Sequence, residues 1–285
     1  MSLRVSAISY LNTAPLMWNF EYGCQRGELR KQFDVEYTIP SRCAQMLAEN
    51  TADIGIIPVA AYTTVPDLRI LGDVAIASKR AVRSILLVST KPIERIRTVA
   101  LDTSSRSSAA LIQVLFAKHW QREVSFAPAD PQLDRMLMQH DAALLIGDPA
   151  LHVDRSRYLT SDLAEEWRSF SGKPFVFAFW AIRSDAAAEQ DLASIAEVFC
   201  ASRDEGLRHI EELADEWATR LKLSRQEIIQ YLTNNIHYRL DEDCLAGMQL
   251  FFRYAAELQV LPPAPELRIV DELKSATPPL QTASK

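Results

Sequence analysis

Short apolar runs alternate with helical patterns along the first half of the chain. The apolar runs lie at residues 4–8, 52–57, 98–101 and 142–146, and each is followed by a polar or turn-forming residue. Between them apolar side chains recur at the spacing of one helix face, most clearly over residues 108–119. Strands that alternate with helices predict an α/β fold with largely parallel sheets.

The second half of the chain has a different pattern. Residues 174–182 form its most apolar stretch, and their aromatic and β-branched content predicts a buried strand that crosses between two parts of the fold. After Asp185 apolar positions recur at helical spacing, which predicts helices that cover a sheet. Five prolines after Leu261 predict an irregular and partly mobile end.

Polar residues follow the first strand at Ser9 and continue through Tyr10 into a turn. Pro15 suits the first turn of a helix, which makes Asn12 or Thr13 the expected N-cap. Backbone N–H groups that are unpaired at a helix start can bind a carboxylate or a phosphate. The junction is therefore either an ordinary capped helix or part of an anion site.

The same design returns at residues 102–108 and 147–149. In the first of these, five hydroxyl side chains and Arg106 crowd the start of one helix. One hydroxyl is enough for an N-cap, so the surplus either solvates a loop or holds an anion. In the second, Gly147 and Asp148 form a turn from a strand into an expected helix.

Composition indicates a globular protein of about two domains. The chain has 285 residues, 48% hydrophobic and 24% charged, which suits a folded chain. No apolar run is long enough to span a bilayer and no secretory signal is visible, so we expect a cytoplasmic protein with no membrane partner. Its four cysteines form no CxxC pair, in line with a reducing compartment. The net charge of −6 disfavours nucleic acid as a partner.

Several common cofactor and metal motifs are missing from the sequence. Neither GxGxxG nor GxxxxGK occurs, which removes the usual support for a nucleotide cofactor. The five histidines are at least 12 positions apart, so no local metal motif is present. The remaining polar groups at strand ends favour a binding site for a small anion between two α/β units.

Six segments occur in order between Arg4 and Arg183. They are RVSAISYLNTAPL, ADIGIIPVAAY, the strand that opens with Ser84-Ile85-Leu86-Leu87, VALDTSSRSSAAL, ALLIGDPAL and EEWRSFSGKPFVFAFWAIR. Together they resemble the chorismate dehydratases, which catalyse the first step of the futalosine route to menaquinone. Each segment alone is weak evidence for this family, but the order and spacing of all six make the resemblance specific.

The resemblance implies the fold of type II periplasmic solute-binding proteins. Such a fold has two α/β lobes joined by two crossing strands, a central ligand cleft and, in this chain, a helical C-terminal third. On that pattern residues 1–90 and 181–285 form one discontinuous lobe, and residues 91–180 form the other. Residues 82–88 and 175–182 would lead into the hinge.

The resemblance also implies the residues of the site. The expected catalytic residues are Asn12, Ser84 and Asp148. The expected substrate-binding residues are Tyr10, Thr103, Ser104, Ser105, Ser107 and Gly147. Arg80 and Arg83 stand where the family is expected to have a smaller turn, and they either supply charge to a dianionic substrate or face water.

The implied activity is a hydro-lyase reaction, the loss of water from chorismate to give 3-[(1-carboxyvinyl)oxy]benzoate without a metal or an organic cofactor. Either Asp148 or the enolpyruvyl carboxylate of the substrate would take the proton. Two alternatives stay open: a non-catalytic solute-binding or sensor protein for a small anion, and the related 1,4-dihydroxy-6-naphthoate synthase. The order of the motifs favours the dehydratase, and the oligomeric state is left open.

Overall fold

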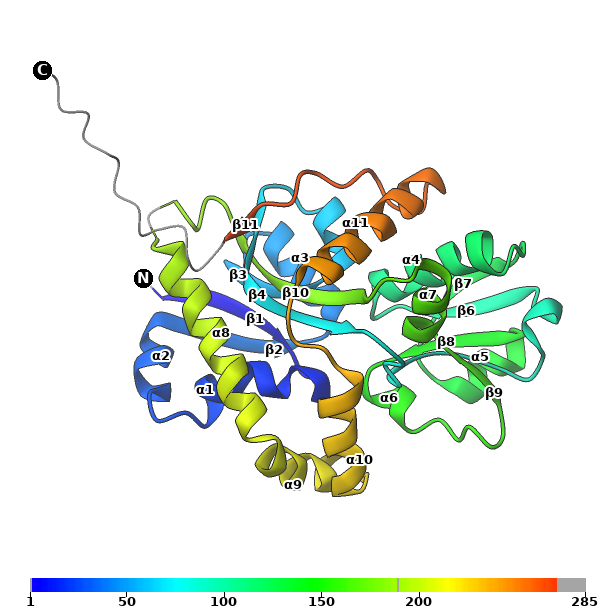
Figure 1. The fold of residues 1–285 in the computed structure, drawn as a ribbon, viewed down its shortest axis with the longest axis horizontal. Helices are drawn as coiled ribbons and strands as arrows, with labels where there is room; N and C mark the ends of the chain where they lie inside the picture. The colour runs from blue at the N-terminus through cyan, green and yellow to red at the C-terminus, as the bar shows by residue number, and fades with distance from the viewer. Residues whose placement is uncertain (1, 189, 271–285) are drawn as a thin grey trace, which may run out of the picture.

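Two β-sheets lie side by side in the computed structural model, which describes residues 2–188 and 190–270 (Figure 1). In spatial order, the strands of the first sheet are β11 (Ile269–Val270), β4 (Leu68–Ser78), β10 (Phe175–Arg183), β3 (Ile54–Pro58), β1 (Leu3–Ile8) and β2 (Phe33–Thr38). Those of the second sheet are β7 (Ser125–Ala129), β6 (Thr98–Asp102), β8 (Ala142–Ile146), β5 (Ile85–Ser89) and β9 (Leu159–Asp162). The predicted α/β fold is confirmed.

Both sheets contain parallel pairs joined by helical connections. β1 pairs in parallel with β2 and β3, and β6 pairs in parallel with β7 and β8. Because a parallel connection has to return over the face of its sheet, these connections place helices against the strands. β10 in the first sheet and β5 in the second run antiparallel to both of their neighbours.

Helical segments cover the sheets and make up most of the C-terminal third. Before residue 160 they are η1 (Leu11–Met17), α1 (Trp18–Glu21), α2 (Arg26–Gln32), α3 (Pro40–Ala48), η2 (Val59–Thr63), η3 (Ile93–Arg95), α4 (Arg106–Val114), η4 (Leu115–His119), α5 (Leu133–Gln139) and α6 (Asp148–Leu151). After it they are α7 (Leu163–Ser171), α8 (Leu192–Arg208), α9 (Ile210–Leu221), α10 (Arg225–Gln230), η5 (Tyr231–Asn235) and α11 (Glu242–Glu257). Phe199 of α8 packs against Trp180 of β10 with ring centroids 4.6 Å apart, so the prediction of sheet-covering helices after Asp185 is confirmed.

β10 is the buried strand predicted at residues 174–182. All of its residues except Arg183 are buried, and Phe179 and Trp180 are fully enclosed. The strand lies between β3 and β4, with α8 and α11 packed nearby, so neither face reaches water. Burial on both faces explains why its sequence is apolar throughout rather than alternating.

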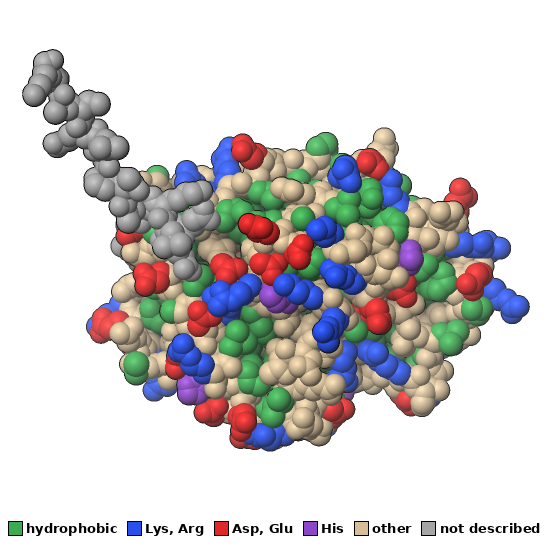
Figure 2. Space-filling model, in the orientation of Figure 1, with side chains coloured by type: hydrophobic (Ala, Val, Ile, Leu, Met, Phe, Trp, Pro, Cys, Tyr) green, Lys and Arg blue, Asp and Glu red, His purple; other side chains and the backbone are tan. Residues whose placement is uncertain are grey.

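Charged side chains of both signs are spread over the surface. On the face shown in Figure 2, Lys and Arg side chains are interspersed with Asp and Glu rather than gathered into one basic patch. Within the described residues, no helix is both long enough and apolar enough to cross a membrane.

The chain passes between the two sheets twice. It leaves the first sheet at the end of β4, enters the second at β5, and returns through α7 into β10. Asp162 fixes the first passage, because its carboxylate accepts the N–H groups of Val82 at 3.0 Å and Arg83 at 2.6 Å. We propose that residues 79–84 and 172–174 are the boundaries between two lobes, slightly before the positions 90 and 181 that the resemblance implies.

The helix after β1 begins earlier than its sequence indicates. It is a 3-10 helix that starts at Leu11, so Tyr10 occupies the N-cap position, and the prediction that Asn12 or Thr13 caps the helix is wrong. The N–H of Leu11 is bound instead by a carboxylate oxygen of Asp148 at 3.1 Å, from 137 positions away in the sequence. The carboxylate of Asp148, at the start of α6 and just after a strand of the second sheet, thus takes the place of a local N-cap side chain.

Part of the segment after Leu261, which the prolines predicted to be irregular, lies within the described residues. Residues 262–268 form no helix or strand, and β11 then pairs in parallel with β4. The N–H of Ile70 donates to the carbonyl of Arg268 at 2.8 Å, which ties this segment to the first sheet. Pro278 and Pro279 lie outside the described residues.

Gly206 on α8 allows that helix to pack closely on η1. A Cβ atom built at Gly206 would lie 2.0 Å from the carbonyl oxygen of Pro15, far inside contact distance. We therefore expect Gly206→Ala to lower the free energy of unfolding by about 1–3 kcal/mol or more, because backbone atoms of η1 have to move. Urea denaturation followed by circular dichroism measures this change.

Gly27→Ala is the matched control for this substitution. Gly27 also lies within a helix, α2, but a Cβ atom there would meet nothing within 4 Å. The control should raise the free energy of unfolding by at most about 0.5–1 kcal/mol, since alanine suits a helix better than glycine and Gly27 lies in the first turn of α2. Equal destabilisation by the two substitutions would contradict the packing argument.

Candidate functional site

A small cavity lies between the two sheets, where the β1–η1 junction meets the turn from β8 to α6. Its volume is about 40 Å³. Its lining residues are Tyr10, Asn12, Ser84, Ser105, Ser108 and Gly147 among others, together with the apolar Ile8, Ile76, Ile146 and Phe177. Space of this size holds about one or two water molecules, so a larger ligand enters only if the two sheets move apart.

The cavity brings together five of the residues expected from the sequence. They are Tyr10, Asn12, Ser84, Ser105 and Gly147. They come from the junction after β1, the residue before β5, the N-cap of α4 and the turn after β8. Strand ends and helix starts from both sheets therefore meet at one point, as in other open α/β sheets.

Two of the expected residues have other surroundings. The hydroxyl of Ser107 is buried and accepts the N–H of Ala60 at 3.0 Å, so it ties α4 to η2. Thr103 is exposed and lines a separate surface hollow with Asp130 and Arg135. Neither residue is among those that line the cavity between the sheets.

Ser104 lies behind the cavity wall and supports it. Its hydroxyl donates to the buried carboxylate of Asp102 at 2.5 Å, and its N–H donates to the same oxygen at 2.9 Å. The second oxygen of Asp102 accepts the N–H of Ile146 at 3.3 Å. Burial raises the pKa of Asp102, against these hydrogen bonds. The hydroxyl of Ser104 also contacts Tyr10, whose pKa is raised mainly by burial.

Ser84 is fully buried and has a partner that the sequence did not suggest. The hydroxyl of Tyr231, on η5, donates to Ser84 Oγ at 2.8 Å. Burial raises the pKa of Tyr231, and its contacts with Ser84 and Asn12 oppose that effect. Because Ser84 Oγ accepts from Tyr231, its own hydroxyl hydrogen is available to the cavity. In the sequence Tyr231 looks like one more apolar position on a helix face, and no local signal marks it.

Gly147 joins the cavity walls through its backbone. Its φ is +64°, and a Cβ atom there would lie 2.7 Å from the Cε2 atom of Tyr10. Its N–H donates to the carbonyl of Ser84 at 2.8 Å. The Gly-Asp turn thus requires glycine both for its backbone conformation and for its contact with Tyr10.

The serine-rich helix start forms one wall of the cavity. Ser105 is the N-cap of α4, and its hydroxyl accepts the N–H of Ser108 at 3.3 Å. The hydroxyls of the two serines lie 3.1 Å apart, and both residues line the cavity. Two hydroxyls and the start of a nine-residue helix suit the binding of a carboxylate. Ser108 was not among the expected site residues, although it belongs to the same motif.

Asp148 lies beside the cavity rather than in its lining. One carboxylate oxygen accepts the N–H of Leu11, as described above. Burial raises the pKa of Asp148 from 3.8 to about 6, and the Leu11 N–H is the largest of the effects that oppose this rise. The carboxyl group therefore titrates near neutrality while it caps η1.

The arginines of the β4–β5 connection do not line the cavity either. Arg80 is exposed. Arg83 has a φ of +64°, and its N–H is held by Asp162. The ligand-charge role that the sequence left open for these two side chains stays a prediction.

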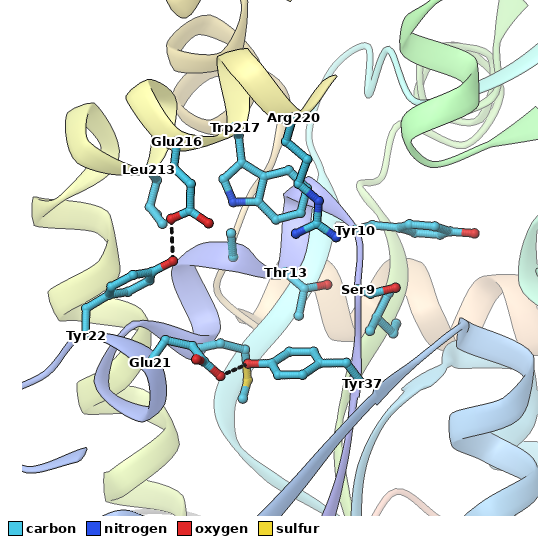
Figure 3. A pocket seen from close by; sticks show the side chains of 13 residues that line it. Ser9, Tyr10, Thr13, Glu21, Tyr22, Tyr37, Leu213, Glu216, Trp217 and Arg220 are labelled. Atoms are coloured by element: carbon cyan, nitrogen blue, oxygen red, sulfur yellow. Dashed lines mark hydrogen bonds between the residues drawn. The ribbon is translucent and has the colours of Figure 1, made fainter. Parts of the chain in front are cut away.

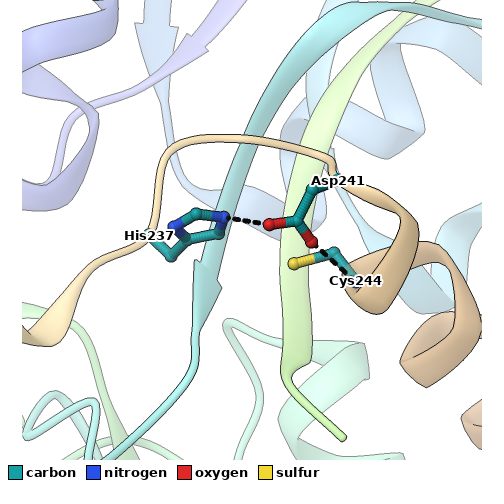
Figure 4. Close-up of side chains that lie close together, drawn as sticks. All are labelled: His237, Asp241 and Cys244. Atoms are coloured by element: carbon teal, nitrogen blue, oxygen red, sulfur yellow. Dashed lines mark hydrogen bonds and ion pairs between the residues drawn. The ribbon is translucent and has the colours of Figure 1, made fainter.

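A second cluster of polar side chains lies at the end of β4. His237, Asp241 and Cys244 place potential ligand atoms within 4.8 Å of one another (Figure 4). However, the ammonium of Lys79 lies 2.5 Å from the Asp241 oxygen that also contacts His237. Burial raises the pKa of Cys244 to about 12, so the thiol stays protonated. A cation already occupies the carboxylate, and the cluster is best described as an ion pair that holds the loop after η5 against β4.

The comparison with protein families covers most of the chain. Residues 3–257 match the family described as menaquinone biosynthesis. The chain belongs to this menaquinone biosynthesis family. A family relative, the chorismate dehydratase of Thermus thermophilus, is 27% identical over 257 residues, which cover 82% of this chain and 89% of that protein. The family resemblance found from the motifs is confirmed.

Solved structures place this family member among periplasmic-binding-protein-like folds. A protein from Archaeoglobus fulgidus superposes with a TM-score of 0.70 at 16% identity, covering 90% of this chain and 97% of that one. A Candida albicans protein described as having the generic periplasmic binding protein fold gives 0.69 at 13% identity, covering 95% and 97%. The periplasmic aliphatic sulphonate binding protein of Escherichia coli gives 0.65 at 14% identity, covering 94% and 96%. The predicted two-lobed fold class is confirmed.

The raised pKa of Asp148 predicts a pH-dependent stability difference. A carboxyl group whose pKa is higher in the folded protein favours folding most below pH 3.8, and this contribution is lost as the pH rises through about 6. Asp148→Asn does not titrate and keeps an oxygen for the N–H of Leu11. Relative to the unchanged protein, the variant should therefore gain stability between about pH 4 and about pH 7, by at most about 3 kcal/mol. Urea denaturation at several pH values measures the difference.

Asp154→Asn gives the opposite control. Asp154 is exposed, and a hydrogen bond from Ser156 lowers its pKa. A lowered pKa stabilises the folded protein only at pH values above it, so the stability of that variant relative to the unchanged protein should fall as the pH rises toward 3.8 and then stay constant between about pH 4 and about pH 7. A gain in relative stability by Asp154→Asn between about pH 4 and about pH 7 would show that the burial of Asp148 is not the cause.

Proposed function

We propose that this chain is a chorismate dehydratase, which eliminates water from chorismate to give 3-[(1-carboxyvinyl)oxy]benzoate in the futalosine route to menaquinone. The observation that carries the proposal is the contact of the buried Ser84 and Tyr231 with the half-buried Asn12 beside the serine-rich start of α4. Family membership and the name of the Thermus thermophilus relative support it. The cavity offers hydroxyl, amide and N–H groups, which suit the carboxylates and hydroxyl of this substrate.

The reaction requires little of the protein beyond holding the substrate in a reactive geometry. The C3–H and C4–O bonds of chorismate break, a C3–C4 double bond forms, and the proton and hydroxyl leave as water. The ring becomes aromatic, which supplies the driving force. The protein has to hold the reacting geometry, exclude bulk water and let one proton move.

The polar groups of the cavity divide into two roles. In the proposed reaction the start of α4, with Ser105 and Ser108, binds a carboxylate. Ser84 and Asn12 orient the ring and the leaving hydroxyl. Tyr231 acts through Ser84 as a positioning residue, because its hydroxyl fixes the direction in which Ser84 can donate. The cavity of about 40 Å³ is too small for chorismate, so the two lobes have to open to admit it.

The substrate's own enolpyruvyl carboxylate is the favoured proton acceptor. It lies close to the C3 hydrogen within chorismate itself. Asp148 is the alternative, and its raised pKa near 6 would suit a general base. Its carboxylate, however, already accepts the N–H of Leu11 and does not line the cavity.

Turnover of chorismate is the direct test. Purified protein, treated with a chelator and desalted, should convert chorismate into a product lighter by one water, detected by mass spectrometry. Binding of chorismate without any change in its mass would overturn the proposal and indicate a solute-binding or sensor protein. Activity that disappears with the chelator and returns with a divalent ion would overturn its cofactor-free form.

Single substitutions separate positioning from proton transfer. Ser84→Ala should raise the barrier by about 2–4 kcal/mol if the lost contact resembles an oxyanion-hole donor, and Tyr231→Phe should have a smaller effect on kcat because it acts through Ser84. Asp148→Asn should retain measurable turnover. A folded Asp148→Asn variant that binds a chorismate analogue normally and is inactive would make Asp148 the base. Initial rates by liquid chromatography distinguish these outcomes.

A further inference from the structure

A larger cavity lies next to the small cavity between the sheets, which we call the cleft. The larger cavity lies within the lobe that contains the first sheet. Its volume is about 290 Å³, and it opens between η1, α1, the end of β2 and α9 (Figure 3). Met17 and Leu213 are buried in its wall, and Trp217 of α9 is only 6% exposed. Tyr22 and Tyr37 add two further rings. The wall is therefore apolar and aromatic enough to receive a ring.

One cation and two carboxylates face this cavity. Figure 3 shows the guanidinium of Arg220 and the carboxylate of Glu216 reaching the hollow from α9, and the carboxylate of Glu21 on the opposite side, near Tyr37. The guanidinium lies over the ring of Trp217, 4.2 Å from its centroid. In the described part of the chain no carboxylate lies within ion-pair distance of Arg220, so its donors are available to a ligand.

Both carboxylates are held in place and can still accept hydrogen bonds. The hydroxyl of Tyr37 donates to Glu21 at 2.5 Å, and that of Tyr22 donates to Glu216. Each carboxylate thereby uses only part of its acceptor capacity. The cavity thus presents separated positive and negative charge beside aromatic rings, an arrangement that a simple anion or a simple cation would match only in part.

We propose that this cavity binds an aromatic α-amino acid in its zwitterionic form. The carboxylate of the ligand would pair with Arg220, whose planar fork suits a carboxylate. The ammonium would contact Glu21, Glu216 and the tyrosine rings, and the aromatic side chain would lie against Trp217 and Met17. This inference goes beyond the proposed function and does not depend on it, since none of these charged residues lines the cleft cavity.

The cavity has a direct connection to the cleft. Ile8 and Tyr10 line both of them. The ring of Tyr10 extends toward the second lobe, where it contacts Gly147. A ligand in the larger cavity would therefore touch a side chain that also closes the cleft.

Isothermal titration calorimetry with the whole protein tests the proposal. L-Phenylalanine should bind about tenfold more tightly than 3-phenylpropionate, which lacks the ammonium, and than phenethylamine, which lacks the carboxylate. Arg220→Ala should weaken L-phenylalanine binding by about tenfold and leave phenethylamine binding unweakened. Replacing both Glu21 and Glu216 by Gln should weaken L-phenylalanine binding similarly and leave 3-phenylpropionate binding unweakened.

Two control variants locate the binding site. Arg208→Ala removes an arginine that pairs with Glu205 and lies outside the cavity, and Ser105→Ala changes the cleft. Both should bind L-phenylalanine as the unchanged protein does. The proposal fails if L-phenylalanine does not bind at millimolar concentration, if Arg220→Ala has no effect, if phenethylamine binds equally well, or if Ser105→Ala abolishes binding. None of these failures would affect the chorismate test, which measures turnover.

Discussion

The contact between Tyr10 and Gly147 is the constraint on which the cleft depends. The Gly147 backbone has a left-handed φ and leaves no space for a Cβ atom beside the ring, so only glycine lets the two lobes approach this closely. Two hydrogen bonds extend the contact on either side, one between backbone groups from the Gly147 N–H to the carbonyl of Ser84, and one from the Leu11 N–H to the side-chain carboxylate of Asp148. The relative positions of Asn12 and Ser84 therefore follow from contacts of main-chain groups with each other, with the Tyr10 ring and with the carboxylate of Asp148.

This geometry gives the cleft fixed hydrogen-bonding directions. Ser84 already accepts from Tyr231, and Ser105 already accepts from the N–H of Ser108, so the remaining donors are limited to the side that faces the cavity. Groups oriented before a ligand arrives do not have to reorganise when charge develops in the ligand. The fold is shared with proteins named as solute binders, so the fold alone does not distinguish binding from the proposed catalysis, and the local orientation of such groups has to do so.

Local signals were enough to predict the architecture, and long-range contacts were not predictable. The apolar runs identified β1, β3, β6, β8 and β10, and polar or turn-forming residues marked their ends, because each signal lies within a few residues. The cap on η1 was wrongly predicted because Asp148 supplies it from the other sheet. Tyr231 was missed, and Thr103 and Ser107 face away from the cavity, because only the packing of distant elements decides which hydroxyls of a polar segment point inward.

The kind of polar group in the cleft bears on which group would take the proton in the proposed reaction. Among the described residues no Lys, Arg or His lines the cavity, and the nearby carboxylates of Asp102, Asp148 and Asp162 accept hydrogen bonds from N–H and hydroxyl donors, although Arg220 and His152 also act electrostatically on Asp148. A carboxylate paired with arginine loses basicity, because the cation stabilises its charged form. A substrate carboxylate held by serine hydroxyls and the start of α4 keeps more of its basicity. A cleft without a lining cation is therefore better suited to a substrate that removes its own proton than one that clamps each carboxylate with arginine.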